Sequence, residues 1–117
     1  MKTYLVFPEL FIRYFFSKDE KVLNRIEGIF KKVEAGKIKL LLTEGLFFLL
    51  AIELEKRIAK KRDVADYLES ILNIHNLKIR NEIILRETVG EMRKGKGFIA
   101  AYRSVAVPLL SLNGVYN

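Results

Sequence analysis

The sequence predicts an α/β fold: a three-layer α/β/α sandwich around a central parallel sheet of about four strands. Two observations lead to this prediction. Short, mainly apolar runs alternate along the chain with longer segments in which apolar residues recur at helical spacing. The short runs lack a regular polar alternation, which is typical of strands buried on both faces of a parallel sheet. At 117 residues the chain is expected to form a single domain, residues 1–117.

The first predicted strand is Tyr4–Phe7, which consists of four apolar residues and ends at Pro8. Proline fits the first turn of a helix, because the N–H that it lacks would have no partner there. We therefore expect a helix over Glu9–Phe16. A strand that runs directly into a helix opens many α/β folds, whose ligand sites lie at the carboxyl ends of the strands.

The next segment predicts a second helix followed by a second strand. Ser17 is expected to cap this helix, with Glu20 three residues later completing a capping box. Gly36 is the expected left-handed residue at the end of the helix. Ile38–Leu42 follows as a short apolar run and is the second predicted strand.

The third predicted helix begins after Thr43, its expected cap. It contains the run Leu46–Ile52, which is apolar on every side of the helix. Such a run is buried in a core or covered by an interface. The second half of the helix, Glu53–Lys61, has a charged face and is expected to be solvated.

The remainder of the chain predicts three more helices and two strands. Asp63 is expected to cap the fourth helix and Asn81 the fifth. A weak third strand is expected at Leu77–Ile79, between these two helices. The sixth helix is expected over Phe98–Val107, and a last strand over Pro108–Leu112.

Charge and composition favour an anionic partner. The formal net charge is +7 and the pI is about 9.7, which makes nucleic acid the first class of partner to consider. The chain is rich in Lys, Glu and Ile and has no Gln, Cys or Trp, a composition reported for thermophile proteins. Its longest apolar run has seven residues, whereas a membrane-spanning helix needs about 20. With no signal-peptide pattern at the N-terminus, a soluble cytoplasmic protein is expected.

Several common types of catalytic site are absent from the sequence. His75 is the only histidine and lies in a predicted turn, where a structural role is the simpler interpretation. There is no cysteine and no G-x-S-x-G pattern for a nucleophile. Gly95-Lys96-Gly97 follows a helix and has the wrong spacing for a phosphate-binding loop. Metal-dependent cleavage of phosphodiesters is left, and it requires carboxylates that converge.

Three stretches together resemble a PIN domain. Tyr4–Phe16 is similar to that family's first strand and helix, where the usual order is an apolar strand, Asp-Thr-Asn and an apolar helix. Gly36–Arg57 is similar to the second strand and the long helix after it. Gly97–Gly114 resembles the family's Asp-Ala-Leu-Ile-Ala-Ala helix and final strand. The stretches occur in the family's order and cover nearly the whole chain.

The resemblance implies a ribonuclease scaffold without its acidic centre. PIN domains are metal-dependent ribonucleases, many of them toxins of toxin–antitoxin pairs, in which an acidic cluster binds Mg²⁺ or Mn²⁺. The family's acidic positions fall on Phe7, Leu49, Lys96 (or Gly97 in a register shifted by one) and Asn113. No Asp or Glu follows Glu91 in the chain. The resemblance therefore implies a degenerate site with no catalytic residue and no cofactor.

Glu9 and Glu44 are the remaining weak candidates for metal ligands, because both are expected near strand ends. Acids in the first turn of a helix also stabilise the helix dipole, which is the simpler explanation for both. An active ribonuclease that uses Mg²⁺ or Mn²⁺ at a migrated site is kept as an alternative hypothesis.

The first hypothesis is thus an inactive PIN-like protein that binds RNA or a protein partner. Basic residues near the ends of predicted helices are candidates for RNA backbone contacts by charge. Cations at helix C-termini are also favourable in themselves, so a purely solvated role is the competing interpretation. The candidates are Lys60, Lys61, Arg62, Arg93, Lys94, Lys96 and Arg103.

A further alternative is a purely structural protein that forms a homodimer or binds an antitoxin-like protein. The run Leu46–Ile52 and the pair Phe15-Phe16 supply more apolar surface than a small core absorbs. Excess apolar surface usually marks an interface. The resemblance adds that PIN-like toxins commonly dimerise and accept an antitoxin segment. No membrane partner is expected.

Overall fold

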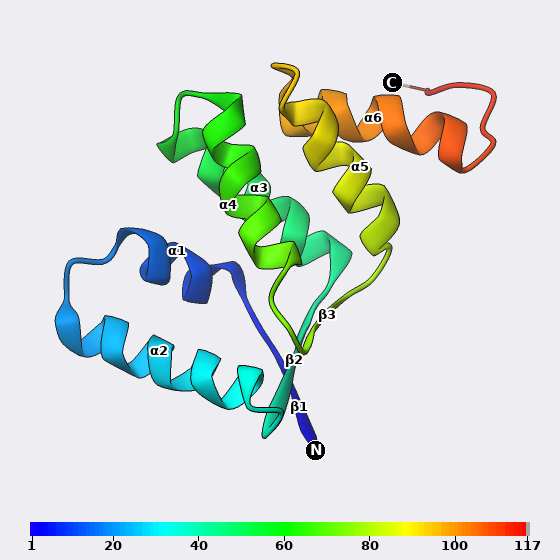
Figure 1. Ribbon diagram of the computed structural model, residues 1–117. Helices are drawn as coiled ribbons and strands as arrows, with labels where there is room; N and C mark the ends of the chain where they lie inside the picture. Colours follow the sequence, from blue (N-terminus) through cyan, green and yellow to red (C-terminus); the bar gives the residue numbers. More distant parts are fainter. Residues whose placement is uncertain (117) are drawn as a thin grey trace. The chain divides into compact units, whose positions relative to one another are not determined.

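Strands and helices alternate along the chain in a computed structural model that describes residues 1–116 (Figure 1). The elements are β1 (Lys2–Leu5), α1 (Pro8–Phe16), α2 (Glu20–Glu34), β2 (Ile38–Leu42), α3 (Glu44–Arg57), α4 (Lys61–Leu72), β3 (Leu77–Ile79), α5 (Glu82–Met92) and α6 (Phe98–Leu109). The chain forms two compact units. We call Met1–Leu50 with Asn73–Arg80 the sheet unit, and Ala51–Leu72 with the chain from Asn81 the helical unit.

The three strands form a parallel sheet in the order β1-β2-β3, so the predicted α/β class is confirmed. In the register of the sheet, Leu5 lies beside Leu41, and Leu42 lies beside Ile79. Every strand therefore ends at the same edge of the sheet. The described residues contain three strands, and the fourth strand expected over Pro108–Leu112 is wrong.

Helical hydrogen bonding explains why Pro108–Leu112 does not form a strand. Helix α6 continues to Leu109, and the next three residues close its last turn. The N–H of Leu110 donates to Ala106, that of Ser111 to Pro108 and that of Leu112 to Val107. Ser111 then leaves the helix with φ of 54°, the left-handed conformation typical of a helix end.

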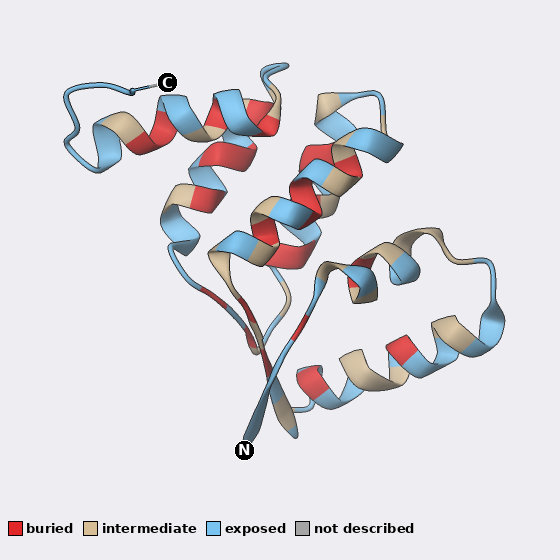
Figure 2. Cartoon of the chain, turned by 180° about the vertical axis from the view of Figure 1, so that it is seen from behind, coloured by how far each residue is buried: buried red, intermediate tan, exposed pale blue. Residues whose placement is uncertain are grey.

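The first strand also differs from its prediction. It spans Lys2–Leu5, two residues earlier than the expected Tyr4–Phe7, and Phe7 instead precedes the first turn of α1. Pro8 occupies that first turn, as predicted. All four residues of β1 are exposed, which contradicts the expected double burial (Figure 2). The reason is position, because β1 is an edge strand and pairs with β2 alone within residues 1–116.

Helices α1 and α2 pack against each other and supply the core of the sheet unit. The ring of Phe30 on α2 stacks on Phe11 at a centroid distance of 6.0 Å and meets Tyr14 edge-on at 5.0 Å. Helix α2 turns Ile26 and Val33 inward as well, because they lie on one face of the helix. The fully or nearly fully buried residues of this unit are Val6, Phe11, Ile26, Val33, Leu40, Leu42, Phe47, Leu50, Leu77 and Ile79.

Of the five predicted helix caps, Thr43 and Gly36 are confirmed, Ser17 and Asp63 are wrong, and Asn81 has the predicted position without a side-chain bond. The Thr43 hydroxyl accepts the N–H of Leu46 at 3.2 Å, and Gly36 has the predicted left-handed φ of 75°. Asp19, not Ser17, caps α2, because its carboxylate accepts the N–H of Lys21. The shorter Ser17 hydroxyl instead accepts the N–H of Asp19 in the connection before the helix.

Asp63 and Asn81 show a similar difference. Helix α4 begins at Lys61, so Asp63 lies inside its first turn, where a negative charge favours the helix dipole. Asn81 precedes α5 as predicted, but in a left-handed conformation with φ of 57° and without a side-chain capping bond. Asparagine tolerates this conformation better than most residues.

In the helical unit, α5 packs against both α4 and α6 (Figure 1). The guanidinium of Arg86 on α5 donates to the carbonyl of Leu72 at the end of α4, at 2.8 Å. Buried side chains form a stripe along each of these helices (Figure 2). They are Val64, Ala65, Leu68, Ile71 and Leu72 on α4, Leu85, Thr88, Val89 and Met92 on α5, and Phe98, Ala101, Val105 and Ala106 on α6.

The start of α6 is held by a carboxylate from a distant part of the chain. Glu55 accepts the N–H of Phe98 at 2.9 Å and a hydrogen bond from Lys61 at 3.2 Å. The first N–H groups of a helix lack partners inside the helix and carry partial positive charge. Glu55 therefore provides a hydrogen-bond acceptor for the first N–H of α6. It also links the start of α6 to α3, which contains Glu55, and to α4, which contains Lys61.

We expect Glu55→Ala to lower the free energy of unfolding by about 1–2 kcal/mol, because the variant loses the carboxylate that caps α6. The matched control is Glu53→Ala, which removes only an exposed ion pair to Arg57 on the same helix. That control should cost less than about 0.5 kcal/mol. Urea unfolding followed by circular dichroism measures both, and equal midpoints for the two variants would contradict the capping role.

Candidate functional site

Parallel pairing places the carboxyl ends of the three strands at one edge of the sheet unit. The residues that follow them are Val6 and Phe7 after β1, Thr43 and Glu44 after β2, and Arg80 after β3. Phe7 is 54% exposed. This edge therefore carries one acid, one base and an exposed aromatic ring, a set that provides no group of converging carboxylates.

Glu9 and Glu44 occupy the positions that favour the simpler of their two interpretations. Glu9 lies exposed in the first turn of α1, and Glu44 is half-buried in the first turn of α3. Both carboxylates lie where a helix dipole stabilises negative charge. Within residues 1–116, no three His, Cys, Asp or Glu side chains are placed to hold a metal ion together.

The positions that the PIN resemblance assigns to acids are all exposed. Leu49 is 58% exposed on α3, beside the buried Phe47 and Leu50, so the run Leu46–Ile52 is not buried on every side. Lys96 lies in the connection between α5 and α6, and Asn113 follows the last turn of α6. Phe7 and Leu49 belong to the sheet unit, whereas Lys96 and Asn113 belong to the helical unit.

Five of the seven predicted RNA-binding residues meet around one open hollow of about 400 Å³ in the helical unit. Two segments about thirty residues apart form it: the residues at the start of α4 and those at the end of α5. We call it the basic hollow. Its lining residues are Lys60, Lys61, Arg62, Arg93, Lys94 and Gly95.

Arg93 is the most firmly positioned cation of the basic hollow. Its Nη1 lies 2.6 Å from Asp66 Oδ1, and its Nη2 lies 2.7 Å from Glu69 Oε2. The two acids are three residues apart and so share one face of α4. Two hydrogen bonds raise the pKa of Arg93. The larger effect comes from the bond to Glu69, and the smaller from the bond to Asp66. The guanidinium therefore remains charged and is fixed against α4.

Glu91 holds two further cations beside the hollow. Lys94 Nζ lies 3.0 Å from Glu91 Oε1, and Lys96 Nζ lies 3.2 Å from Glu91 Oε2. Hydrogen bonds from both lysines lower the pKa of the Glu91 carboxyl group, and the bond from Lys94 has the larger effect. One carboxylate thus holds two ammonium groups close together and leaves an excess of positive charge.

Positive charge exceeds negative charge in the whole arrangement. The carboxylates in contact with these cations are Glu55, Asp66, Glu69 and Glu91, four against the six cations that include Lys96. Lys60 and Arg62 are exposed, and neither forms an ion pair with any residue that the structure describes. The excess charge is therefore carried mainly by Lys60 and Arg62.

Two predicted candidates and four unpredicted acids complete the comparison with the sequence. Arg103 lies exposed on α6, and neither Arg103 nor Lys96 lines the hollow. Lys96 shares its partner Glu91 with Lys94, which does line it. The sequence predicted no partner for Glu55, Asp66, Glu69 or Glu91. The i, i+3 spacing of Asp66 and Glu69 was a signal that these two share a face, but their partner is 24 residues or more away.

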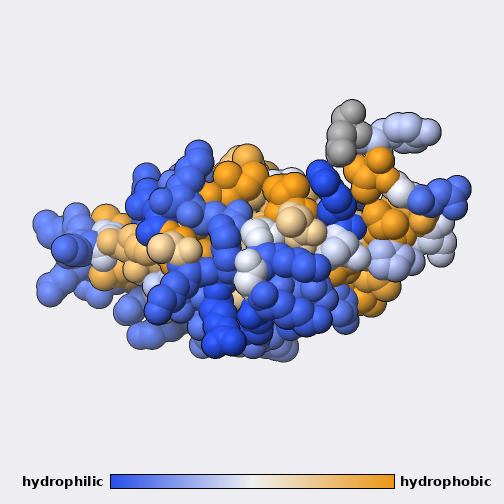
Figure 3. All heavy atoms as spheres, turned by 90° about the horizontal axis from the view of Figure 1, so that it is seen from above, coloured by the Kyte–Doolittle hydropathy of each residue, from blue (hydrophilic) through white to orange (hydrophobic). Residues whose placement is uncertain are grey.

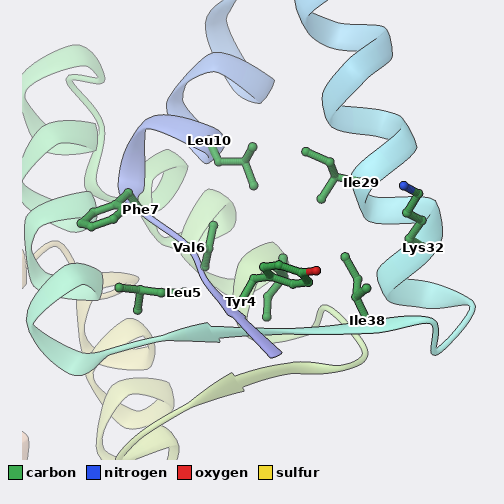
Figure 4. Close-up of a pocket in the computed structure, with 9 residues that line it drawn as sticks. Tyr4, Leu5, Val6, Phe7, Leu10, Ile29, Lys32 and Ile38 are labelled. Carbon is green, nitrogen blue, oxygen red and sulfur yellow. The ribbon is translucent and has the colours of Figure 1, made fainter. Parts of the chain in front are cut away.

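The sheet unit has a hollow of the opposite character. It has a volume of about 390 Å³ and lies beside β1, with side chains from α1, α2 and β2 on its other sides (Figure 4). We call it the apolar groove. Its lining residues are Tyr4, Leu5, Val6, Phe7, Leu10, Ile29, Lys32, Ile38 and Leu40, of which Lys32 alone is charged.

The surface mixes charged and apolar regions. Hydrophilic residues cover most of the face seen in Figure 3, and apolar residues reach the surface in separate patches. None of the helices within residues 1–116 has the length and apolar character required to cross a lipid bilayer.

Comparison of the chain with protein-family models, with curated proteins and with solved structures gives no match. Function is therefore inferred from the residues and their geometry.

The lowered pKa of Glu91 predicts a specific loss of stability in acid. A carboxyl group whose pKa is lower in the folded state contributes stability above its unfolded pKa, and this contribution is lost as pH falls through the folded pKa. Between about pH 5 and pH 3, the unfolding midpoint in urea should fall more in the wild type than in Glu91→Gln. Glu87→Gln, on an exposed position of the same helix, should keep the wild-type dependence. Parallel curves for all three proteins would contradict the assignment.

Proposed function

We propose that the protein binds the phosphate backbone of RNA at the basic hollow and does not cleave it. The observation that supports this proposal is the meeting of two basic segments, residues 60–62 and 93–94, around one hollow. A net charge of +7 adds long-range attraction for a polyanion. An inactive PIN-like protein is the form of this function that the sequence resemblance implies.

The ion pairs of the hollow favour binding of phosphate over a merely solvated cluster. Arg93 is held by Asp66 and Glu69, and Lys94 is held by Glu91, so these side chains lose little freedom when an anion arrives. Lys60 and Arg62 contribute charge that the surrounding acids leave uncompensated. A phosphate group in the hollow would therefore meet positioned charges on one side and unneutralised charges on the other.

The composition of the lining also indicates which part of the RNA is contacted. The described lining of the basic hollow contains no aromatic side chain. Binding of single strands through bases depends on aromatic rings on which the bases stack. The hollow therefore suits backbone phosphates, and binding should depend little on nucleotide sequence.

A PIN-like three-layer scaffold is part of the same proposal. It is supported by the threefold order of one strand and two helices, and by the parallel order β1-β2-β3. The loss of cleavage is supported by the strand ends. Phe7 follows β1 where the resemblance requires an aspartate, and an aromatic ring supplies no oxygen ligand for a divalent ion.

Binding of RNA should weaken when charge is removed from the hollow. Fluorescence anisotropy with a labelled single-stranded RNA of about ten nucleotides measures this at several salt concentrations. The double variant Lys60→Ala/Arg62→Ala should lose roughly tenfold in affinity at low salt and about 1.4 in the slope of log K against log salt. The control Lys31→Ala/Lys37→Ala loses the same charge from exposed positions of the sheet unit and should bind almost as the wild type does. Equal losses in both double variants would show attraction by net charge alone.

The absence of cleavage has its own test. Calorimetry with Mn²⁺ should show no saturable binding up to millimolar concentrations, and the labelled RNA should stay intact in the presence of Mn²⁺. Saturable binding that Glu44→Gln abolishes would instead support a ribonuclease with a migrated site on Glu9 and Glu44. Glu34→Gln, an exposed acid at the end of α2, serves as the control for this variant.

A further inference from the structure

The outer side of β1 has backbone groups that no other strand uses. The N–H of Val6 donates to the carbonyl of Leu41 at 2.9 Å, so the backbone groups of Val6 face β2. Backbone direction alternates along a strand, and Tyr4 therefore faces β2 as well. The N–H and C=O groups of Thr3 and Leu5 consequently point away from the sheet. β1 is an edge strand, and its neighbour among residues 1–116 is β2 alone.

Few of the usual features protect this edge. Edge strands that avoid pairing commonly carry several charges, a proline or a bulge. Of the residues that form β1, only Lys2 is charged. Tyr4 is 49% exposed and Leu5 is 51% exposed, so apolar surface accompanies the backbone groups. In Figure 4 the Tyr4 ring extends toward Ile38, whereas the Leu5 side chain points in another direction.

We propose that this edge binds β1 of a second copy of the chain, antiparallel, with the two-fold axis at Tyr4. In that register, Thr3 of each copy lies opposite Leu5 of the other. The outward N–H and C=O groups of both residues then form hydrogen-bonded pairs. The two Tyr4 side chains lie opposite each other, and the two three-stranded sheets become one continuous sheet.

Charge and the pairing of both outward-facing residues together select this register. Lys2 lies opposite Val6 of the other copy, so the two Lys2 residues are separated by roughly 14 Å along the strands, given about 3.4 Å per residue. Pairing centred on Thr3 would bring the two lysines closer, with fewer apolar residues in contact. The register centred on Tyr4 pairs both outward-facing residues and separates the charges that repel each other.

The area of the contact determines how strong the dimer should be. The exposed halves of two Tyr4 rings cover roughly 200 Å², since an aromatic side chain buries about 150–250 Å² when fully covered. With Leu5 and the strand backbone, each copy still buries less than the roughly 800 Å² of a standard interface. The dimer should therefore dissociate on dilution. Salt should strengthen it, because Lys2 and Lys32 give the edge and groove a positive charge.

Single cysteines test the register directly, because the natural chain contains no cysteine. Opposed residues of a non-hydrogen-bonded antiparallel pair have Cα atoms about 4.5 Å apart, within the range of a disulfide. Tyr4→Cys should therefore form a covalent dimer under mild oxidation, whereas Lys2→Cys should not. Cross-linking of Lys2→Cys as fast as that of Tyr4→Cys would overturn the register.

A proline variant tests the edge without changing the tyrosine. Thr3→Pro removes an N–H that points away from β2, so the internal ladder of the sheet is kept. Sedimentation of the wild type from about 5 to about 500 µM should show a dimer that grows with concentration. Thr3→Pro should shift this equilibrium toward monomer at least tenfold, and the control Thr3→Val, which retains the N–H, should not.

Two outcomes of the sedimentation experiment would overturn the proposal. The first is a wild-type chain that stays monomeric over the whole range, and the second is a dimer that Thr3→Pro does not weaken. The result is independent of RNA binding, because salt should strengthen the dimer but weaken the RNA complex. Failure of one proposal therefore leaves the other standing.

Discussion

Parallel pairing of β1, β2 and β3 is the constraint on which the sheet unit depends. Parallel neighbours cannot be joined by a tight turn, so long helical crossovers connect β1 to β2 and β2 to β3. The same pairing gathers Phe7, Glu44 and Arg80 at one edge and leaves the outward groups of Thr3 and Leu5 at the side of the sheet. The possible chemistry of the sheet unit therefore follows from the order of its strands.

The helical unit uses charge in a different way, as a means of fixing long side chains. Arg93, Lys61 and Lys94 each contact at least one carboxylate, and the two contacts of Arg93 join segments that are 24 and 27 residues apart. A surface ion pair contributes little to stability by itself. A set of such pairs around one hollow nevertheless holds the cations in place, which is the property that an anion site requires.

Local patterns predicted most elements because their signals lie within one turn or one strand. The apolar periodicity of α2 and α4, the cap at Thr43 and the left-handed Gly36 all depend on residues within a few positions. The strand predicted over Pro108–Leu112 was wrong for the same reason, because only local patterns were used. Its apolar composition fits a strand or a helix end, and the carbonyls of α6 that accept its N–H groups decided between them.

The exposure of β1 and the partners of the basic residues could not be read from local patterns. A mainly apolar strand looks the same at the edge of a sheet and at its centre, and only the strand order places β1 at the edge. The cations near residues 60 and 93 were identified from their charge. Their meeting around one hollow depends on how α4 and α5 pack, which no spacing within either segment specifies.

The contact between Glu55 and the start of α6 also bears on the residue that precedes that helix. A Cβ atom built on Gly97 would lie 3.4 Å from Glu55 Oε2, so a side chain there would lie in contact with the carboxylate. An aspartate at position 97 would add a second negative charge against Glu55 and would compete with it for the N–H of Phe98. In this chain the acid at the start of α6 is Glu55, which reaches it from α3.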